Sequence, residues 1–288
     1  MDLDQLRALS ATVAAGSLDA AARALHVTPS AVSQRLKALE TATGQVLLVR
    51  GRPARPTASG EVLLRLARQV ELLTADAVRE LGGATESRPA TLPIAVNADS
   101  LATWVLPALA PLAGEVALDL HVADQARTSE LLRAGTVMAA VTDTADPLPG
   151  CSSTPLGSMR YRPAATAAYL ARWLPDGPAA EALERAPVVV FDRTDDLQAA
   201  QLRARGVDPA RPPVHHVPSS ADFLHAVRLG MGWGMVPDLQ DVEGDLVELG
   251  TDGAVDVTLY WQQWRLRSPS LDRVGAAVLE AAGRALRR

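Results

Sequence analysis

The chain has 288 residues, of which 48% are hydrophobic and 21% charged, enough for about two ordinary domains with apolar cores. This composition excludes disordered, collagen-like and low-complexity proteins. Acidic residues stand at the N-terminus where a signal peptide needs a basic region, and no run of about 18 uncharged apolar residues occurs. We therefore expect a soluble, cytosolic protein. The single cysteine, Cys151, excludes an internal disulfide and a thiolate zinc cage.

Charge is distributed unevenly along the chain. The net charge is −5, but residues 1–60 hold seven basic and four acidic side chains, which gives +3 there and −8 in the remainder. Six of the seven basic residues fall between positions 23 and 55, opposed only by Glu40. A basic segment joined to an acidic body indicates a small nucleic-acid-binding module.

Residues 1–44 are predicted to form three short helices. The spacing of apolar residues indicates a first helix that begins at Leu3 and stops at Gly16. Ser17 can cap a second helix that contains Leu25, and a third helix follows the turn HVTP and runs to about Thr43.

The third predicted helix has two different faces. Thr28 is a good N-cap, and Pro29 stands at the first helical position, where its missing N–H costs nothing. The apolar face comprises Val32, Leu36 and Leu39, and the opposite face carries Ser30, Ser33, Gln34 and Lys37. In a major groove, Gln34 could pair with adenine and Lys37 with guanine or a phosphate. An ordinary solvated helix face is the alternative.

A Gly/Pro-rich hairpin is expected after a strand at residues 47–49. It presents arginines that could grip phosphates, as the wing of a winged helix does. The residues predicted to bind DNA are Thr28, Ser30, Ser33, Gln34, Arg35, Lys37, Arg50, Arg52 and Arg55.

A long helix is predicted from about Ala58 to Leu81. Its apolar residues repeat every 3.5 positions, at Leu63, Leu66, Val70, Leu73 and Ala77. This seam favours pairing with the same helix of a second subunit. The alternative is a helix that packs on its own chain.

The segment LRALSATVAAGSLDAAARALHVTPSAVSQRLKALETATGQVLLVRGRPARPTASG resembles the winged helix-turn-helix of LysR-type transcriptional regulators, and the long helix is similar to their dimerisation helix. The sequence departs from the family at Leu18 and Leu48, where Phe is common. No aromatic residue precedes Trp104, which removes base stacking as a means of binding single strands. Duplex promoter DNA is therefore the expected partner.

The remainder is predicted to alternate strands and helices after a linker at residues 86–89. Strands are expected at LPIAVNA, VALDLHV and VMAAVT. One helix, capped by Asp99 or Ser100, should extend through Trp104, and another should cover residues 128–134. This order implies a parallel, doubly wound sheet that binds ligands at the carboxyl ends of its strands.

A second set of elements is expected after the stretch at residues 147–163. It comprises VVVFD, the strand HHV, a helix after Ser220, then GWGMVP and VTLYWQQW. The last helix, at about residues 271–286, should return to the first lobe. Two such lobes, linked by two crossing strands, resemble the effector domain of LysR-type regulators, which is similar to periplasmic solute-binding proteins.

The predicted fold is mixed α/β. A winged helix-turn-helix DNA-binding domain with a long dimerisation helix precedes a two-lobed, periplasmic-binding-protein-like effector domain. The predicted boundaries are 1–60 for the DNA-binding domain, 61–88 for the linker helix and 89–288 for the effector domain, with lobe I at about 90–162 and 265–288 and lobe II at about 163–264.

Polar residues at the predicted strand ends are candidate ligand-binding residues, namely Asp99, Ser100, Asp124, Thr142, Asp143, Ser219, Ser220 and Asp222. Serines at helix N-termini suit a carboxylate, and the aspartates suit cations. A basic amino acid would use both sets. Each aspartate taken alone could instead be a helix cap or a turn residue.

The segments NADSLATWVLPAL, LLRAGTVMAAVT, LGSMRY and VPSSADFLHAVRLGMGWGMVP resemble the ArgP/LysG-like subgroup of LysR-type regulators, which senses lysine and arginine and controls amino-acid export. The resemblance implies L-lysine or L-arginine as effector, with Tyr161 and Trp233 lining the cleft. It also implies a homodimer or homotetramer on promoter DNA. RNA polymerase is a further candidate partner, and no membrane contact is expected.

No catalytic motif competes with this interpretation. GxSxG, HExxH and Walker A patterns are absent, and Gly230, Gly232 and Gly234 lie between a helix and a strand, the reverse of a dinucleotide loop. We predict no catalytic residue, metal or cofactor. The alternatives are a LysR-type regulator of another small ligand, a ligand-independent architectural DNA-binding protein, and an enzyme or transport-type binding protein with a basic N-terminus.

Overall fold

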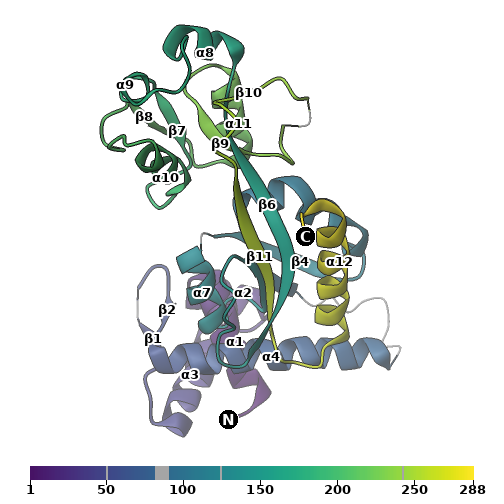
Figure 1. Ribbon diagram of the computed structural model, residues 1–288. Helices are drawn as coiled ribbons and strands as arrows, with labels where there is room; N and C mark the ends of the chain where they lie inside the picture. Colours follow the sequence, from purple (N-terminus) through teal and green to yellow (C-terminus); the bar gives the residue numbers. More distant parts are fainter. Residues whose placement is uncertain (50, 82–90, 124, 242) are drawn as a thin grey trace.

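The computed structural model describes residues 1–49, 51–81, 91–123, 125–241 and 243–288. A small helical domain and the long helix α4 lie at one end of the molecule, and two α/β lobes extend from them (Figure 1). The predicted site residues Arg50 and Asp124 and the expected linker at residues 86–89 lie outside the described residues.

The N-terminal helices begin where predicted, while the second ends one residue before Leu25 and the long helix ends one residue before Leu81. They are α1 (Leu3–Ala15), α2 (Leu18–Ala24), α3 (Pro29–Thr43) and α4 (Ala58–Glu80). The side chains of Ser17 and Thr28 each accept a backbone N–H at the start of α2 and α3. Gly16 and Gly44 end α1 and α3 in the left-handed conformation, which glycine adopts without strain.

A small aliphatic core holds these helices together. Leu9, Val32 and Leu39 are fully buried in it, with Leu47 from the chain that follows α3. The strands β1 (Leu48–Val49) and β2 (Arg55–Pro56) then form an antiparallel hairpin that leads into α4.

Lobe I is built on the strands β3 (Thr91–Val96), β4 (Ala117–Val122) and β5 (Ala139–Thr142), which pair in parallel as predicted. Its helical segments are α5 (Ala98–Ser100), a π-helix (Leu101–Val105), α6 (Leu106–Leu109), a 3₁₀-helix (Ala110–Leu112), α7 (Gln125–Arg133) and the C-terminal α12 (Pro269–Ala285). The last of these packs on α6 and the π-helix, so the chain returns to lobe I.

Two long strands, β6 (Cys151–Ala165) and β11 (Val255–Trp264), join the lobes (Figure 1). The strands β3, β4 and β5 are parallel as predicted, whereas β11 joins their sheet antiparallel to β5 and also runs antiparallel to β6. The reason is that β11 returns directly from lobe II without a crossover helix. Most of the stretch at residues 147–163, for which no element was predicted from the sequence, belongs to β6.

Lobe II contains the parallel pair β7 (Val188–Val190) and β8 (Val214–His216), and the strands β9 (Gly234–Pro237) and β10 (Val247–Glu248), which pair with β6. Its helices are α8 (Ala167–Trp173), α9 (Ala180–Leu183), α10 (Leu197–Ala204) and α11 (Ser220–Arg228). Phe223 and Val227 of α11 are buried against Val236 of β9, so α11 is fixed to the lobe II side of the molecule.

Helix α4 packs on its own chain through one face. Leu64 and Ala67 are buried in the N-terminal core, and Leu72 is buried in the core of lobe I. The predicted seam lies beside this face, half-buried at Leu63, Leu66 and Val70 and exposed at Leu73 and Ala77. Neither α4 nor any other helix in the described part of the chain is long and apolar enough to cross a membrane.

Candidate functional site

The first candidate surface combines α3 with the hairpin, which lie at the same end of α4 (Figure 1). Most of the predicted DNA-binding residues described here have exposed side chains, namely Ser30, Ser33, Gln34, Lys37, Arg52 and Arg55. The backbone N–H of Ala54 donates to the carbonyl of Gly16 over 2.8 Å, which fixes the hairpin to the helical domain.

Two predicted DNA-binding residues have structural contacts of their own. The Thr28 hydroxyl accepts the backbone N–H of Ala31 over 3.2 Å as the cap of α3. The Arg35 guanidinium lies 2.7 Å from the carboxylate of Asp4 on α1. Arg35 therefore ties α3 to α1, and its positive charge is partly neutralised within the domain.

The second candidate site lies where the two lobes meet. Asp99 belongs to α5 of lobe I, and its carboxylate accepts a hydrogen bond from the Tyr161 hydroxyl on β6 over 2.9 Å. The same carboxylate accepts a second hydrogen bond, over 2.6 Å, from the hydroxyl of Ser220 on α11 of lobe II. One side chain thus connects both lobes and one of the strands between them.

Asp99 is available for these contacts because Asn97 caps the helix. The Asn97 side chain accepts the backbone N–H of Ser100 over 2.7 Å, so the expectation that Asp99 or Ser100 is the cap is wrong. A residue at the N-cap would turn its oxygen back toward the helix N-terminus. Two positions later, the Asp99 carboxylate instead faces the other lobe.

Two further carboxylates, Asp143 and Asp195, act electrostatically on Tyr161. We call Asp99, Asp143, Tyr161, Asp195 and Ser220 the junction cluster. Burial, followed by the charge and hydrogen bond of Asp99, raises the pKa of Tyr161 well above its ordinary value, so this hydroxyl remains a donor. Burial raises the pKa of Asp143 and of Asp195, and the charge of Asp99 adds to the effect on Asp195. Asp143 and Asp195 therefore ionise less readily than ordinary aspartates.

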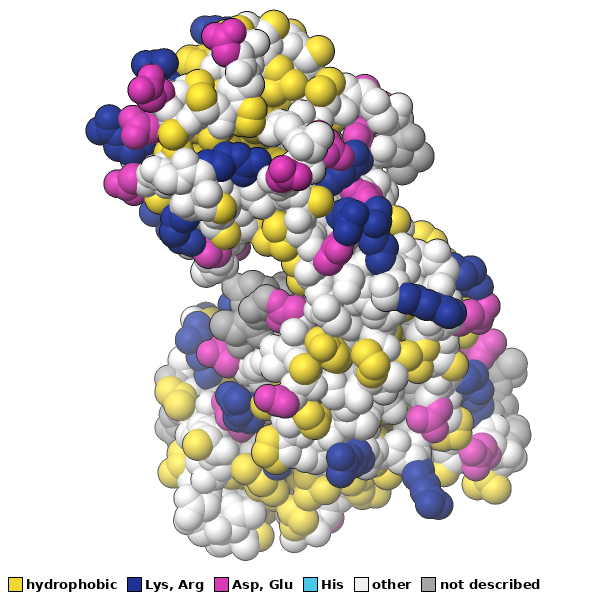
Figure 2. Space-filling model, viewed as in Figure 1, with side chains coloured by type: hydrophobic (Ala, Val, Ile, Leu, Met, Phe, Trp, Pro, Cys, Tyr) yellow, Lys and Arg dark blue, Asp and Glu magenta, His cyan; other side chains and the backbone are white. Residues whose placement is uncertain are grey.

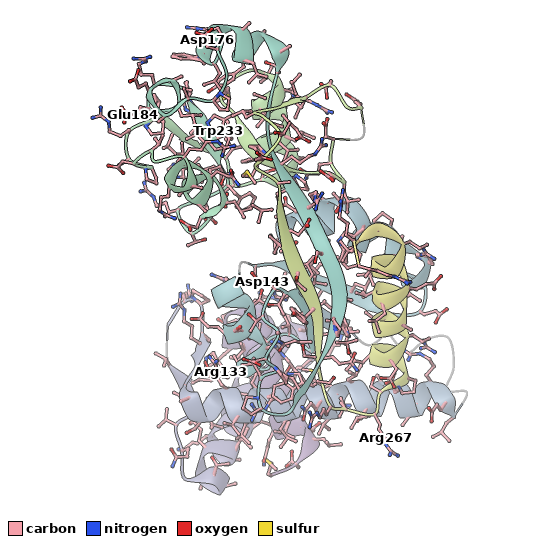
Figure 3. All side chains as sticks on the ribbon, in the orientation of Figure 1. Arg133, Asp143, Asp176, Glu184, Trp233 and Arg267 are labelled. Atoms are coloured by element: carbon pink, nitrogen blue, oxygen red, sulfur yellow. The ribbon has the colours of Figure 1, made fainter. Side chains whose placement is uncertain are left out.

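Unfilled hydrogen-bonding capacity surrounds this cluster. Gln240 donates to the Ser220 hydroxyl, and a Gln198 hydrogen bond stabilises the Asp195 carboxylate. In the described part of the chain, the buried oxygens Gln240 Oε1, Gln198 Oε1 and Ser100 Oγ have no protein partner. Buried polar atoms normally find a partner, so these atoms are suited to a polar ligand or water. Figure 2 shows the surface hollowed between the lobes, on the side where Figure 3 labels Asp143.

Other predicted ligand residues lie outside this cluster. Ser219 caps α11, where its hydroxyl accepts the backbone N–H of Asp222, and the Asp222 side chain is exposed. Trp233 is buried in the core of lobe II beside Leu183 and Leu202, away from Asp143 (Figure 3). Its indole therefore packs the lobe interior and does not line the space between the lobes.

Thr142 was predicted to bind the ligand, whereas Asp195 was not. The buried Thr142 hydroxyl accepts the backbone N–H of Thr144 over 3.3 Å, one residue from Asp143. Asp195 was missed by sequence reasoning, although it follows the predicted strand VVVFD by three residues. The strand-end rule that selected Asp143 could have selected Asp195 as well.

The sequence matches two family descriptions. The bacterial regulatory helix-turn-helix protein, lysR family, matches residues 3–61, and the LysR substrate binding domain matches residues 86–283. The chain is a LysR-family protein.

Relatives of this LysR-family protein are closely similar over nearly their whole length. The lysine export transcriptional regulatory protein LysG of Corynebacterium efficiens is 46% identical over 280 residues, covering 94% of each chain. The crystal structure of ArgP from Mycobacterium tuberculosis has a TM-score of 0.86 and 45% identity, covering 100% of this chain and 99% of that one. The full-length structure of LysG from Corynebacterium glutamicum with bound effector Arg has a TM-score of 0.77 and 40% identity, covering 100% of both chains.

Proposed function

We propose that this LysR-family protein is a cytoplasmic transcription regulator that senses L-lysine or L-arginine and controls an amino-acid exporter or a related gene. Its role is regulatory and not catalytic. The names of the similar LysG and ArgP proteins, and the arginine in the similar LysG structure, support this assignment.

The observation that carries the proposal is the gathering of carboxylates at the lobe junction. Asp99, Asp143 and Asp195 all act on one buried hydroxyl, and their mutual repulsion in a partly desolvated space is unfavourable unless a cation joins them. An amino acid with a cationic side chain supplies that charge. Its α-carboxylate would take the unpartnered hydroxyl of Ser100 and main-chain N–H groups near it.

DNA binding is assigned to residues 1–60. In this proposal α3 enters the major groove, with Ser30, Ser33, Gln34 and Lys37 toward the bases, and the hairpin arginines bind phosphates. The seam on α4, which is half-buried at Leu63, Leu66 and Val70 and exposed at Leu73 and Ala77, pairs with a second copy. Lobes I and II, with the boundaries predicted above, bind the effector. Two DNA-binding heads held by one helix pair suit a pseudo-palindromic promoter site.

Calorimetric titration of the full-length chain tests the effector. We expect saturable binding of L-arginine or L-lysine, and no binding of L-glutamate or benzoate. Asp143→Asn and Asp195→Asn should each weaken arginine binding about tenfold or more, because a hydrogen bond to a charged group is worth about 1.5–3 kcal/mol. Affinity should also fall as the pH is lowered toward the ordinary aspartate pKa of about 4, and the fall should begin at a higher pH than for ordinary aspartates, because burial raises the pKa of both carboxyls.

Asp222→Asn is the matched control for this experiment. It removes a carboxylate from the first turn of α11, but that side chain is exposed and lies outside the junction cluster. Its affinity for arginine should equal that of the wild type. Equal losses in all three variants, or binding of benzoate in place of arginine, would contradict the proposed effector.

DNA binding is tested with a duplex selected from a random pool by the full-length protein. Gln34→Ala should reduce discrimination against a mismatched base pair by about 1–3 kcal/mol, because the amide reads a base edge. Arg52→Ala should weaken binding to every duplex alike and lower the slope of log K against log salt by about one. Anisotropy titrations on selected and random duplexes separate these effects, and an equal loss on both duplexes in both variants would refute the division of roles.

A further inference from the structure

One segment of lobe I connects the junction cluster with α4. Val96 of β3 lies opposite Val122 of β4, and Ala95 lies opposite Ala140 of β5, so the carboxyl ends of these parallel strands meet at one sheet edge. α7 follows β4 from that edge, and β5 returns to it and ends beside Asp143. The turn between α7 and β5 consequently lies at the opposite edge, about 13 Å away along the nine residues of α7.

The α7–β5 turn contacts α4 through two hydrogen bonds. The Arg68 guanidinium donates to the carbonyl of Gly135 over 2.7 Å, and Arg65 donates to the carbonyl of Arg133 over 3.3 Å. Arg133 is the last residue of α7 and Gly135 lies two residues beyond it, so both guanidinium groups are near the helix C-terminus, where the dipole is negative and favours a cation. Figure 3 labels Arg133 at the end of α7 that faces α4.

The contact is close enough to involve the two main chains. Gly135 has φ +65°, and a Cβ added there would lie 2.6 Å from the Cα of Arg65. Only glycine allows the turn this conformation and this approach. Arg65 also stacks over the ring of Trp264 at 4.8 Å, which holds its side chain in place at the end of β11. A displacement of the turn therefore displaces α4 directly.

The same two turns of α4 contact the DNA-binding domain. Leu64 and Ala67 are buried in the N-terminal core, and the Glu71 carboxylate accepts a hydrogen bond from Ser10 of α1 over 3.1 Å. Burial raises the pKa of Glu71 and lowers that of Arg68, so both charged groups are shielded from solvent where the three elements meet. At residues 64–71, α4 is thus held between α1 and the α7–β5 turn.

We propose that Arg65 and Arg68 couple the effector site to the DNA-binding domain, because their hydrogen bonds transmit a movement of the α7–β5 turn to α4. This inference rests on the proposed function, because it takes a basic effector at the junction cluster as the input. A ligand shifts the chain only through contacts that differ between two arrangements. Asp143 lies just after the end of β5, and the α7–β5 turn lies at its start. Movement of Asp143 therefore changes the contact of this turn with α4, and α4 transmits the change to α1.

Hydrogen–deuterium exchange of the full-length chain, with and without L-arginine, tests this coupling. In the wild type we expect altered exchange near the junction cluster and also in α1 and in α4. In Arg65→Ala and Arg68→Ala the change in α1 and α4 should be lost, while the change at the cluster and the calorimetric affinity for arginine persist. Arg68→Lys should restore part of the change, because an ammonium can still donate to the Gly135 carbonyl.

Arg133→Ala is the matched control, since it removes an exposed cation from the same turn but keeps the carbonyl that accepts from Arg65. It should respond as the wild type does. The coupling alone would be overturned if the exchange response of α1 and α4 persisted in Arg65→Ala and Arg68→Ala. It would also be overturned if arginine changed the exchange of the wild type at the junction cluster but not in α1 and α4. A wild type without any arginine response at the cluster would overturn the proposed effector, and the coupling with it.

Discussion

Asp99→Asn is expected to lower the affinity for L-arginine by about 30-fold or more. Removing one charge from a buried, hydrogen-bonded ion pair costs about 2–5 kcal/mol, and each 1.4 kcal/mol is a factor of ten. Asp99 is the junction residue whose carboxylate contacts both Tyr161 and Ser220, so its charge lies at the point where the lobes meet. Calorimetric titration with L-arginine measures the loss.

The asparagine variant should remain folded, because its amide has nearly the shape of the carboxylate and can bond both hydroxyls. The melting temperature checks this. Asp146→Asn, on the exposed part of the loop after Asp143, is the matched control and should bind arginine with wild-type affinity. Wild-type affinity in Asp99→Asn would show that the effector charge is bound elsewhere.

Asp76→Asn is expected to destabilise the chain by roughly 2–4 kcal/mol, because it leaves buried donors without their acceptor. Asp76 lies on α4 and is almost fully buried. Its carboxylate accepts hydrogen bonds from the hydroxyls of Ser268 and Ser270, over 2.5 and 2.6 Å, and from Arg79 over 2.9 Å. These serines stand at the N-terminus of α12, so one carboxylate fastens α4 to the effector domain.

The difference in the free energy of unfolding between wild type and Asp76→Asn depends on pH through the pKa of Asp76. Burial alone would raise that pKa, but the hydrogen bonds from Ser268, Ser270 and Arg79 bring it below the ordinary value. A lowered pKa gives a stabilisation that is complete above the unfolded-state pKa and is lost as the pH falls through the folded-state pKa. The difference between wild type and Asp76→Asn should therefore be full at neutral pH and shrink in acid below about pH 4.

Urea unfolding at several pH values measures this difference. Asp272→Asn is the matched control, since Asp272 lies in the first turn of the same helix but is exposed. Asp272→Asn should lower the free energy of unfolding by no more than about 1 kcal/mol, the usual contribution of a carboxylate near a helix N-terminus. A similar loss in both variants would mean that Asp76 acts only through the helix dipole.

Local signals predicted the N-terminal half of the fold well. The cap at Thr28, the proline after it and the glycines at positions 16 and 44 act within one or two turns of chain, and the structure confirms the helix ends that they indicate. The strands of lobe I were also predicted, β3 and β5 from their continuous apolar runs and β4 from its alternating residues. The family followed from these elements in their order.

Contacts between distant residues were predicted less well. Asp99 and Ser220 were both chosen as ends of separate elements, yet their hydrogen bond depends on how two lobes close around β6 and β11. Trp233 was expected in the cleft, but it fills the core of lobe II. A residue's place along the chain gives its element, whereas its neighbours depend on packing.

The sequence by itself determined the three N-terminal helices, the hairpin, the long helix and the alternation of strands and helices, since these depend on periodicity and on capping residues a few positions apart. Only the tertiary structure decided that Asp195 joins Asp99 and Asp143, that Asp76 is buried against α12, and that β11 runs antiparallel. These features join residues 44 to 194 positions apart. Their energies come from burial and hydrogen bonds that exist only after the chain has folded.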